Sequence, residues 1–283
     1  MAQVLKSVKI KSYSKINLSL RILDKLKSGM HNIETNSTLI NIYDELTIKI
    51  NKKDETVFKG IFKEKVNSKK NSILLSLKLL RKMKLIKDNY KVIIKKNIPV
   101  FSGLGGGTSN AYSILKYFLK NKVNQRLIGE FEKKIGSDFR LFQYKHSIQK
   151  KLKKVSKSDN RLNLNLIIVY PHINCKTASI YKMVNKFSKA SINRYLKKMN
   201  SNKFIEMLIK DKNDLQELVE KKYPSVLKLI NTIHSQNGCI ISRMTGSGSA
   251  CFGVFKSKKT AKQASNKLKK IYPKYWCVTT KTI

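Results

Sequence analysis

The sequence predicts an α+β protein with enough apolar residues to build more than one core. The chain has 283 residues, of which 41% are hydrophobic, and this suits two compact domains or one large one. Alternating or β-branched runs typical of strands occur at 90–95 and 162–170, and apolar residues recur at helical spacing at 71–80 and 215–235. Because both kinds of run occur in both halves of the chain, we expect mixed helices and strands throughout.

The other elements follow from the same signals in chain order. Strand patterns at 7–14 and 14–23 precede an extended run at 35–50, and Asn71 or Ser72 is placed to cap the next helix. Further along we expect helices at 111–119, 127–135 (ended by Gly136), 191–209 and 261–270, two strands joined by a glycine turn at 238–255, and a last strand at 276–280. A polar, charged stretch at 150–160 is the predicted domain boundary, with domains at 1–156 and 157–283.

The charge of the chain is strongly positive. Lys and Arg number 60 against 17 Asp and Glu, a net charge of +43, which on its face indicates a nucleic acid or an anionic membrane as partner. The lysines are nevertheless scattered through nearly every segment, and 149–154 is the one dense run. No zinc-finger spacing, RNP-like strand or basic zipper accompanies them. We therefore expect no specific nucleic-acid partner.

The sequence does not indicate a membrane protein, a disulfide-bonded protein or a protein that binds a transition metal. Lysines interrupt the apolar residues of the N-terminus, and no run of about 18 apolar residues occurs, so we expect a cytoplasmic protein without a membrane partner. The four cysteines include no C-x-x-C pair, and the four histidines include no H-x-H or H-x-x-x-H pair. We expect no protein metal site.

The most informative stretch is a glycine loop. Four of the five residues from Gly103 to Gly107 are glycine, Thr108 and Ser109 follow, and the loop lies between a strand pattern and a helix pattern. Backbone N–H groups without side chains can approach phosphate oxygens, and the positive end of the next helix favours the same anion. Thr108 and Ser109 then either cap this helix or hold a metal-bound phosphate.

Other glycine motifs fit this loop less well. A P-loop requires a lysine after its last glycine, where this chain has Thr108. A dinucleotide fingerprint also lacks its third glycine at Thr108, and no acidic residue ends a second strand at the expected distance. A turn without ligand remains the alternative, although four glycines carry a conformational entropy cost that a plain turn does not need.

The stretch from Pro99 to Ala111, Pro-Val-Phe-Ser-Gly-Leu-Gly-Gly-Gly-Thr-Ser-Asn-Ala, resembles the ATP loop of the GHMP small-molecule kinases. Its second half is similar to the branch that phosphorylates 4-diphosphocytidyl-2-C-methyl-D-erythritol in isoprenoid precursor synthesis. The resemblance implies a two-domain GHMP kinase fold, with an N-terminal nucleotide-binding domain, a ferredoxin-like C-terminal domain and an active site in a cleft between them. It assigns ATP contacts to Asn71, Lys96, Pro99, Gly103, Leu104, Gly105, Gly106, Gly107, Thr108 and Ser109.

Two further motifs carry the chemistry that the resemblance implies. Lys15 and Asn17 are two residues apart on a predicted strand and should share a face, and Lys-Ile-Asn-Leu resembles the family's first motif, whose lysine lies beside the reacting hydroxyl group. Gly-Ser-Asp at 136–138 resembles the segment that carries the catalytic carboxylate, here Asp138. The family's Val-Pro-Phe-Phe is replaced after Asp138 by Phe-Arg-Leu-Phe, which makes the local geometry less certain than the identity of the carboxylate.

In the same way the resemblance assigns substrate contacts to Asn17, His31, Asp138, Thr177 and Tyr181. His31 matches the histidine that reads the cytosine edge, and Met30 replaces a tyrosine that would stack on the base. Thr177 and Tyr181, at helical spacing, match positions that hold the substrate, although spacing alone is equally consistent with a half-buried tyrosine. The turn with Gly246, Ser247 and Gly248 resembles a loop that packs against the phosphate site.

The resemblance thus implies transfer of the γ-phosphoryl group of ATP, with Mg²⁺, to the 2-hydroxyl group of a cytidine diphosphate sugar alcohol. Asp138 would accept the proton, and Lys15 would hold both Asp138 and the attacking oxygen. We expect a monomer or a weak homodimer. Two alternatives stay open: another GHMP kinase, for a mevalonate-type or amino-alcohol substrate, and an RNA-binding protein that uses this fold.

Overall fold

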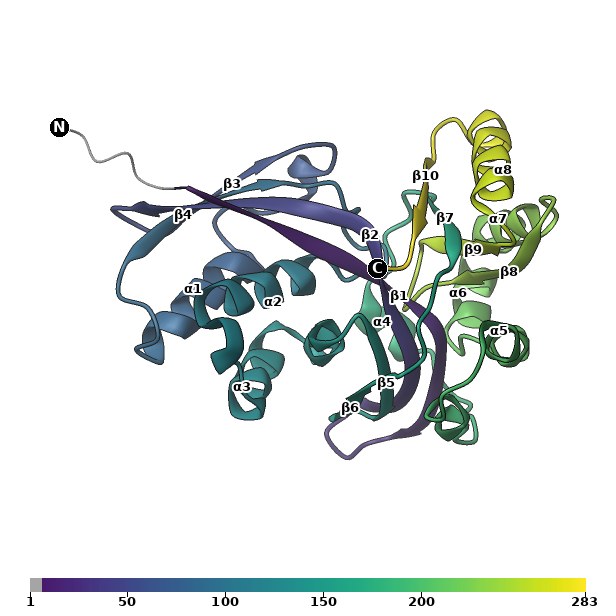
Figure 1. Ribbon diagram of the computed structural model, residues 1–283, viewed down its shortest axis with the longest axis horizontal. Helices are drawn as coiled ribbons and strands as arrows, with labels where there is room; N and C mark the ends of the chain where they lie inside the picture. The colour runs from purple at the N-terminus through teal and green to yellow at the C-terminus, as the bar shows by residue number, and fades with distance from the viewer. Residues whose placement is uncertain (1–6) are drawn as a thin grey trace. The chain divides into compact units, whose positions relative to one another are not determined.

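The structure is a computed structural model and describes residues 7–283 (Figure 1). The chain forms two compact units, and each unit is assembled from separate stretches. The first unit contains residues 7–14, 42–100 and 105–143, and the second contains 15–41, 101–104 and 144–283. Two long strands, β1 (Val8–Lys25) and β2 (His31–Asn51), contribute residues to both units. The two strands predicted at 7–14 and 14–23 are therefore one continuous strand.

The first unit is a sheet covered by three helices. Residues Glu45–Asn51 of β2 pair antiparallel with β4 (Asn89–Lys95), and β4 pairs parallel with β3 (Glu55–Lys59). Helices α1 (Ser72–Lys82), α2 (Gly106–Leu119) and α3 (Gln125–Ile135) lie together on one side of these strands (Figure 1).

Period-two alternation explains which side the helices cover. Leu46 and Ile48 of β2 and Val92 and Ile94 of β4 are buried, and the residues between them in each strand are more exposed. The apolar stripes of the helices pack on these side chains, with Leu77 of α1 among the residues that have no exposed surface.

The second unit contains an antiparallel sheet of four strands in the order β10-β7-β9-β8. Their bounds are Asn165–Tyr170 for β7, Cys239–Met244 for β8, Cys251–Phe255 for β9 and Trp276–Lys281 for β10. Helices α7 (Pro224–His234) and α8 (Lys258–Ile271) pack on this sheet, and α6 (Gln216–Lys222) precedes α7. The remaining helices are α4 (Thr177–Tyr181) and α5 (Ser201–Ile209).

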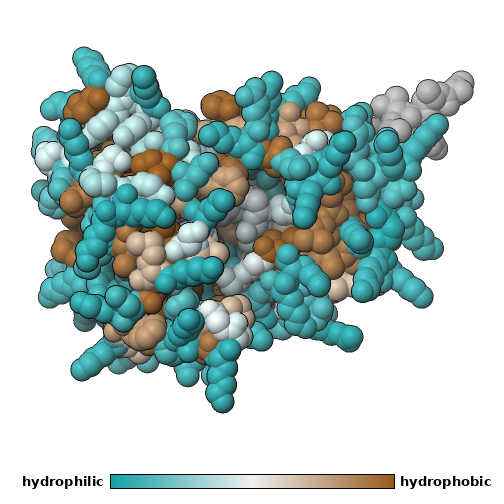
Figure 2. All heavy atoms as spheres, turned by 180° about the vertical axis from the view of Figure 1, so that it is seen from behind, coloured by the Kyte–Doolittle hydropathy of each residue, from teal (hydrophilic) through white to brown (hydrophobic). Residues whose placement is uncertain are grey.

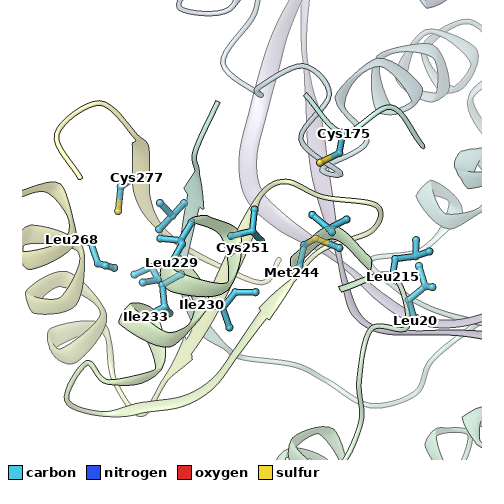
Figure 3. Close-up of a cluster of buried hydrophobic side chains, with 14 of the residues drawn as sticks. Leu20, Cys175, Leu215, Leu229, Ile230, Ile233, Met244, Cys251, Leu268 and Cys277 are labelled. Carbon is cyan, nitrogen blue, oxygen red and sulfur yellow. The ribbon is translucent and has the colours of Figure 1, made fainter. Parts of the chain in front are cut away.

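The core of the second unit contains several sulfur atoms. Cys175, Met244, Cys251 and Cys277 belong to one buried cluster with aliphatic side chains that include Leu20, Leu215, Leu229 and Leu268 (Figure 3). Cys175, Cys251 and Cys277 are buried and unpaired. Burial raises the pKa of the Cys175 thiol to about 11, and it also raises the pKa of Cys251. These thiols behave as small apolar groups, as expected for buried cysteines.

Two predicted helices differ from the structure. The predicted helix at 191–209 is a 3₁₀ turn (Ile192–Tyr195) followed by α5, and the predicted helix at 215–235 is divided where Pro224 begins α7. The residue before a proline is biased away from helical angles, and Tyr223 has φ −135° and ψ 82°. Residues 150–157 of the polar stretch belong to a hairpin of β5 (His146–Lys151) and β6 (Lys154–Lys157), and the domain bounds drawn from this stretch stay a prediction.

The hairpin forms because β5 pairs antiparallel with residues Thr35–Thr38 of β2 within the second unit. Its lysines remain largely exposed while Ile148 is buried. Hydrophilic side chains are exposed elsewhere on the surface as well, since they project over much of the face seen in Figure 2. Among the described helices, none combines the length and the apolar composition needed to cross a bilayer.

Candidate active site

Helix α2 presents its N-terminus directly after the glycine loop. Its N-cap is Gly105, with φ 70° and ψ 22°, and no side chain caps the helix. Of the two alternatives for Thr108 and Ser109, capping of α2 does not occur, because the helix already begins at Gly106. The first N–H groups of an α-helix have no acceptor within the helix, and the first turn of α2 contains no acidic residue. This end of α2 is suited to an anion.

Gly106 is required by close packing. A Cβ atom at this position would lie 2.9 Å from Cγ2 of Ile98 and 2.9 Å from Nζ of Lys96. Both neighbours belong to the segment that leads into the loop, so a side chain at Gly106 would push the helix start away from that segment. The glycine allows the N-terminus of α2 to lie close to residues 96–98.

Ser109 attaches α2 to strand β1. Its hydroxyl group donates to the carbonyl oxygen of Tyr13 at 2.6 Å, and its Oγ lies 2.7 Å from Oγ of Ser12. On the other side of the loop, Oγ of Ser72 donates to the carbonyl oxygen of Gly107 at 2.7 Å. The helix start is thus held by side chains of β1 and α1, while Thr108 is half-buried.

Asn71 and Lys96, two further nucleotide candidates of the first unit, have partners inside it. Asn71 caps α1, as predicted: its Oδ1 accepts from the backbone N–H groups of Ile73 and Leu74, each at 3.1 Å, and its Nδ2 donates to Oγ1 of Thr56. The ammonium group of Lys96 is buried 2.6 Å from Oδ2 of Asp44. Burial lowers the pKa of Lys96, and the charge of Asp44 opposes this shift.

Asp138 belongs to a 3₁₀ segment, Ser137–Gln143, that follows Gly136. The altered residues after it are anchored in the core of the first unit. Phe139 is fully buried, with its ring centroid 5.4 Å from that of Phe131 and 5.5 Å from that of Tyr112. Arg140 pairs with Glu132 at 2.8 Å. The segment that replaces the family's Val-Pro-Phe-Phe is therefore held by the ring contacts of Phe139 and by the ion pair of Arg140.

Lys15 and Asn17 lie on the same face of β1 in the second unit, as predicted. Nζ of Lys15 donates to Oδ1 of Asn17 at 2.5 Å, and Nδ2 of Asn17 donates to Oγ1 of Thr35 at 2.7 Å. Only 2% of Lys15 is exposed. A buried ammonium group is held in one position by this series of hydrogen bonds, and Thr35 was not identified from the sequence.

The glycine turn between β8 and β9 packs against residues 101–104 of the same unit. A Cβ atom at Gly103 would lie 2.3 Å from the carbonyl oxygen of Thr245, so only glycine fits. The backbone N–H of Ala250 donates to the carbonyl oxygen of Ser102 at 3.1 Å. Oγ1 of Thr245 accepts from the N–H of Asn17 at 2.9 Å. The turn therefore supports both residues 102–103 and strand β1.

Asn213 closes this turn from the other side. Its Nδ2 donates to the carbonyl oxygens of Met244 and Gly246, at 2.9 and 2.8 Å. Gly246, Ser247 and Gly248 lie within the turn, and Oγ of Ser247 is 2.9 Å from Oγ1 of Thr177. Thr177 is thereby joined to the turn.

His31 and Tyr181 are also brought together in the second unit. Their ring centroids lie 5.2 Å apart, with the planes tilted by 38°. His31 is 8% exposed, and among the described residues no hydrogen-bond partner exists for its buried Nε2. Burial, followed by the charge of Lys25, lowers the pKa of His31. The imidazole is thus favoured in its neutral form, beside an aromatic ring and with one buried polar atom that lacks a hydrogen-bond partner among the described residues. The neighbouring Met30 is 48% exposed.

The matches to known proteins agree with this arrangement. Residues 188–274 match the family model described as GHMP kinases C terminal. The chain is 34% identical to the 4-diphosphocytidyl-2-C-methyl-D-erythritol kinase of Pelagibacter ubique (strain HTCC1062), over 98% of this chain and 99% of that protein. It is 30% identical to the enzyme of the same name from Wolbachia sp. subsp. Drosophila simulans (strain wRi), over 99% and 100%.

Solved structures share the fold. A crystal structure of 4-(cytidine 5'-diphospho)-2C-methyl-D-erythritol kinase aligns with a TM-score of 0.75 at 18% identity, over 97% of this chain and 99% of that one. The homoserine kinase of Cytophaga hutchinsonii aligns with a TM-score of 0.71 at 16% identity, over 100% and 97%. The fold is thus shared with kinases that are named for different substrates, so the fold alone does not identify the substrate.

Proposed function

We propose, since this chain belongs to the 4-diphosphocytidyl-2-C-methyl-D-erythritol kinase family of GHMP kinases, that it transfers the γ-phosphoryl group of ATP to the 2-hydroxyl group of 4-diphosphocytidyl-2-C-methyl-D-erythritol. The chain matches its relatives over nearly their whole length. The product would serve isoprenoid precursor synthesis without mevalonate, as the motifs imply. The cytoplasmic location and the monomeric or weakly dimeric state remain predictions.

The pair of His31 and Tyr181 is the observation that carries the substrate assignment. A pyrimidine base presents a flat π face and an edge of hydrogen-bonding groups, and proteins bind such bases by stacking and edge contacts. Tyr181 offers the ring, and His31 offers a buried nitrogen that has no partner among the described residues. Mevalonate and homoserine lack a base, so this pair supports the cytidyl substrate over the other GHMP substrates.

The N-terminus of α2 is proposed to bind the ATP phosphates. The backbone at Gly105, Gly106 and Gly107 can approach an anion without side chains in the way, and the helix dipole adds to the attraction. Lysine side chains elsewhere in the first unit would add favourable charge at longer range.

Mg²⁺ is proposed to arrive with ATP. Among the described residues, no group of three or more His, Cys, Asp or Glu side chains is placed to hold a metal ion. In kinases Mg²⁺ is commonly held by one or two protein oxygens together with substrate phosphates, and the hydroxyl group of Thr108 is a suitable oxygen at the start of α2. The ion would neutralise negative charge on the phosphate groups of ATP.

The protein groups proposed for the chemistry are Asp138 and Lys15. Asp138 would take the proton of the substrate's 2-hydroxyl group. The oxygen of that hydroxyl group would bond to the γ-phosphorus of ATP as ADP leaves. Lys15, fixed by Asn17, would stabilise negative charge on the attacking oxygen. Because Asn17 in turn is fixed by Thr35 and Thr245, the position of the ammonium group depends on the whole hydrogen-bonded series.

The test is ADP formation by the purified protein with ATP and Mg²⁺. We expect ADP formation that depends on 4-diphosphocytidyl-2-C-methyl-D-erythritol, with phosphorylation of the 2-hydroxyl group identified by ³¹P NMR. Mevalonate and homoserine, at the same concentration, serve as matched substrates that lack the cytidine group. Equal turnover with either of them, or none with the cytidyl compound, would contradict the proposal.

A further inference from the structure

A carboxylate lies in the core of the first unit, at a position where the strand pattern calls for an apolar residue. The inward-facing positions of β2 include Ile42, Leu46 and Ile48, all of which are buried, and Asp44 occupies the position between the first two. Asp44 has no exposed surface. A buried carboxylate is unfavourable unless it is paired and hydrogen-bonded, so its partners explain why it is retained.

Asp44 accepts four hydrogen bonds, two at each oxygen. Oδ2 accepts from Nζ of Lys96 at 2.6 Å and from Nδ2 of Asn110 at 3.0 Å. Oδ1 accepts from the backbone N–H groups of Asn97 and Ile98, at 2.8 and 2.9 Å. Nδ2 of Asn97 also donates to the carbonyl oxygen of Tyr43. One side chain of β2 thus satisfies the charge of Lys96 and two backbone donors.

These donors flank the glycine loop on both sides. Asn97 and Ile98 lie where the chain leaves β4 and enters the loop, and Asn110 lies in the second turn of α2, where the chain has left the loop. The same two segments meet at Gly106, whose missing Cβ leaves room for Ile98 and for the ammonium group of Lys96. The position of the α2 N-terminus relative to residues 96–98 is therefore set through Asp44.

We infer that Asp44 is a positioning residue for nucleotide binding: it holds the entry and exit of the glycine loop together so that the first N–H groups of α2 are ordered before a nucleoside triphosphate binds. The inference rests on the proposed function, because it concerns the same phosphate site. An ordered site binds more tightly since less conformational entropy is lost on binding. In this role Lys96 acts on the loop through Asp44, whether or not it also contacts the nucleotide.

Two double variants separate the role of the carboxylate from that of its charge. Asp44→Leu with Lys96→Met removes the four acceptor contacts without leaving a buried charge unpaired. Asp44→Asn with Lys96→Met also lacks the charges, but it keeps an oxygen for the N–H groups of Asn97 and Ile98. Its new amide group can donate to Oδ1 of Asn110 once the Asn110 amide turns over, because at present Nδ2 of Asn110 faces residue 44 and Oδ1 is buried with no hydrogen-bond partner among the described residues. Both variants lack Lys96, so any contact of Lys96 with ATP is removed equally.

We expect the Leu-containing double variant to bind ATP about tenfold more weakly than the Asn-containing one, as the loss of two backbone hydrogen bonds implies. Isothermal titration calorimetry with ATP measures this ratio. Both variants should bind the cytidyl substrate equally, because His31 and Tyr181 belong to the second unit. Equal ATP affinity of the two variants would overturn the positioning role. The role would also be overturned if the Leu-containing variant bound the cytidyl substrate more weakly than the Asn-containing one by the same factor as ATP.

A milder pair guards against misfolding of the double variants. Asn110→Ala removes one donor to Asp44, whereas Ile114→Val, one turn further along α2, removes a buried methyl group and no hydrogen bond to Asp44. We expect weaker ATP binding in Asn110→Ala alone when the two variants are compared at similar melting temperature. Loss of ATP affinity in both variants would mean that it follows stability, and the positioning role would be wrong.

Hydrogen exchange of the ligand-free protein separates this inference from the proposed function. Peptides that cover 97–110 should exchange faster in the Leu-containing double variant than in the Asn-containing one, while peptides from α7 should not differ. Unchanged exchange at 97–110 would overturn the inference even if the protein phosphorylates the cytidyl substrate. A parent protein that binds no ATP would overturn both the proposed function and the positioning role, and faster exchange would then show that Asp44 only stabilises the fold.

Discussion

The ring centroids of His31 and Tyr181 lie 5.2 Å apart in the second unit, although the two residues are far apart in the sequence. His31 begins strand β2 and Tyr181 ends the short helix α4. Tyr181 also packs against the core of this unit. The pair combines an aromatic ring with a ring that carries a polar nitrogen.

Tyr181→Ala should weaken binding of the cytidyl substrate by roughly 1 to 3 kcal/mol, the range for a base stacked on an aromatic ring. The KM for the cytidyl substrate, measured with ATP saturating, reports this change. Tyr181→Phe is the matched control, because it keeps the ring and its packing and should retain most of the affinity. An unchanged KM in Tyr181→Ala would remove this residue from the substrate site.

Gly106→Ala should strongly reduce ATP binding while most of the fold remains. The added methyl group would lie 2.9 Å from Ile98 and from the ammonium group of Lys96, so the start of α2 must shift. Gly129→Ala is the control, since its nearest neighbour would be 3.5 Å away in the middle of α3, and alanine favours a helix by about 1 kcal/mol. Calorimetry with ATP should show normal binding in Gly129→Ala; normal binding in Gly106→Ala as well would mean that the loop is only a turn.

Asp138→Asn should lower kcat by about 10² to 10⁴, the usual effect of removing a general base. The Kd for ATP should not change, because the amide keeps the size and most hydrogen bonding of the carboxyl group. Adding Lys15→Ala should then reduce kcat little further, since residues that act on one oxygen are not additive. Near-parental formation of phosphorylated product by Asp138→Asn would refute its assignment as the base.

Acid should destabilise the protein through His146. Burial lowers its pKa to about 4, although a hydrogen bond from its ring to the carbonyl oxygen of Asn160 opposes the shift. The unfolded state takes up the proton below its ordinary pKa of about 6.5, whereas the folded state does so only near pH 4. The stability that neutral His146 provides is therefore complete above pH 6.5 and is lost as the pH falls towards 4, by up to about 3 kcal/mol.

Urea unfolding at pH 7.5, 6 and 5 measures this dependence. His146→Gln, which cannot titrate, should be less stable at pH 7.5 but should lose less free energy of unfolding between pH 7.5 and 5. The difference between the two slopes is attributed to His146 alone, because the other groups are the same in both proteins. Parallel curves for the parent and the variant would contradict the predicted pKa shift.

Local signals predicted the elements with clear patterns. Asn71 caps α1 as expected from its residue type, and β4, α1 and β10 were predicted to within two residues at each end. Lys15 and Asn17 face the same way because the period of a strand is two. For these features the information lies in neighbouring residues, so a single sequence is sufficient.

Features that depend on distant partners were missed. The start of α2 was predicted too late because glycine has low helix propensity, yet tertiary packing on Ile98 favours a helix from Gly106. Strand β5 was missed because its lysines hide the pattern, and its pairing with β2 decides its conformation. Asp44 was missed although a carboxylate within a run of inward-facing apolar residues is a visible signal, because its main partner, Lys96, is 52 residues away.

The sulfur-containing core of the second unit supplies a chemical reporter for that unit alone. All four cysteines of the sequence fall within its stretches, and none falls within those of the first unit. Since burial raises the pKa of Cys175, Cys251 and Cys277, few thiolates are exposed to an alkylating reagent until the chain opens. Alkylation rates of Cys175, Cys251 and Cys277, followed by mass spectrometry, would therefore time the opening of the second unit. Nucleotide added during labelling would show whether ligand contacts at α2 slow that opening.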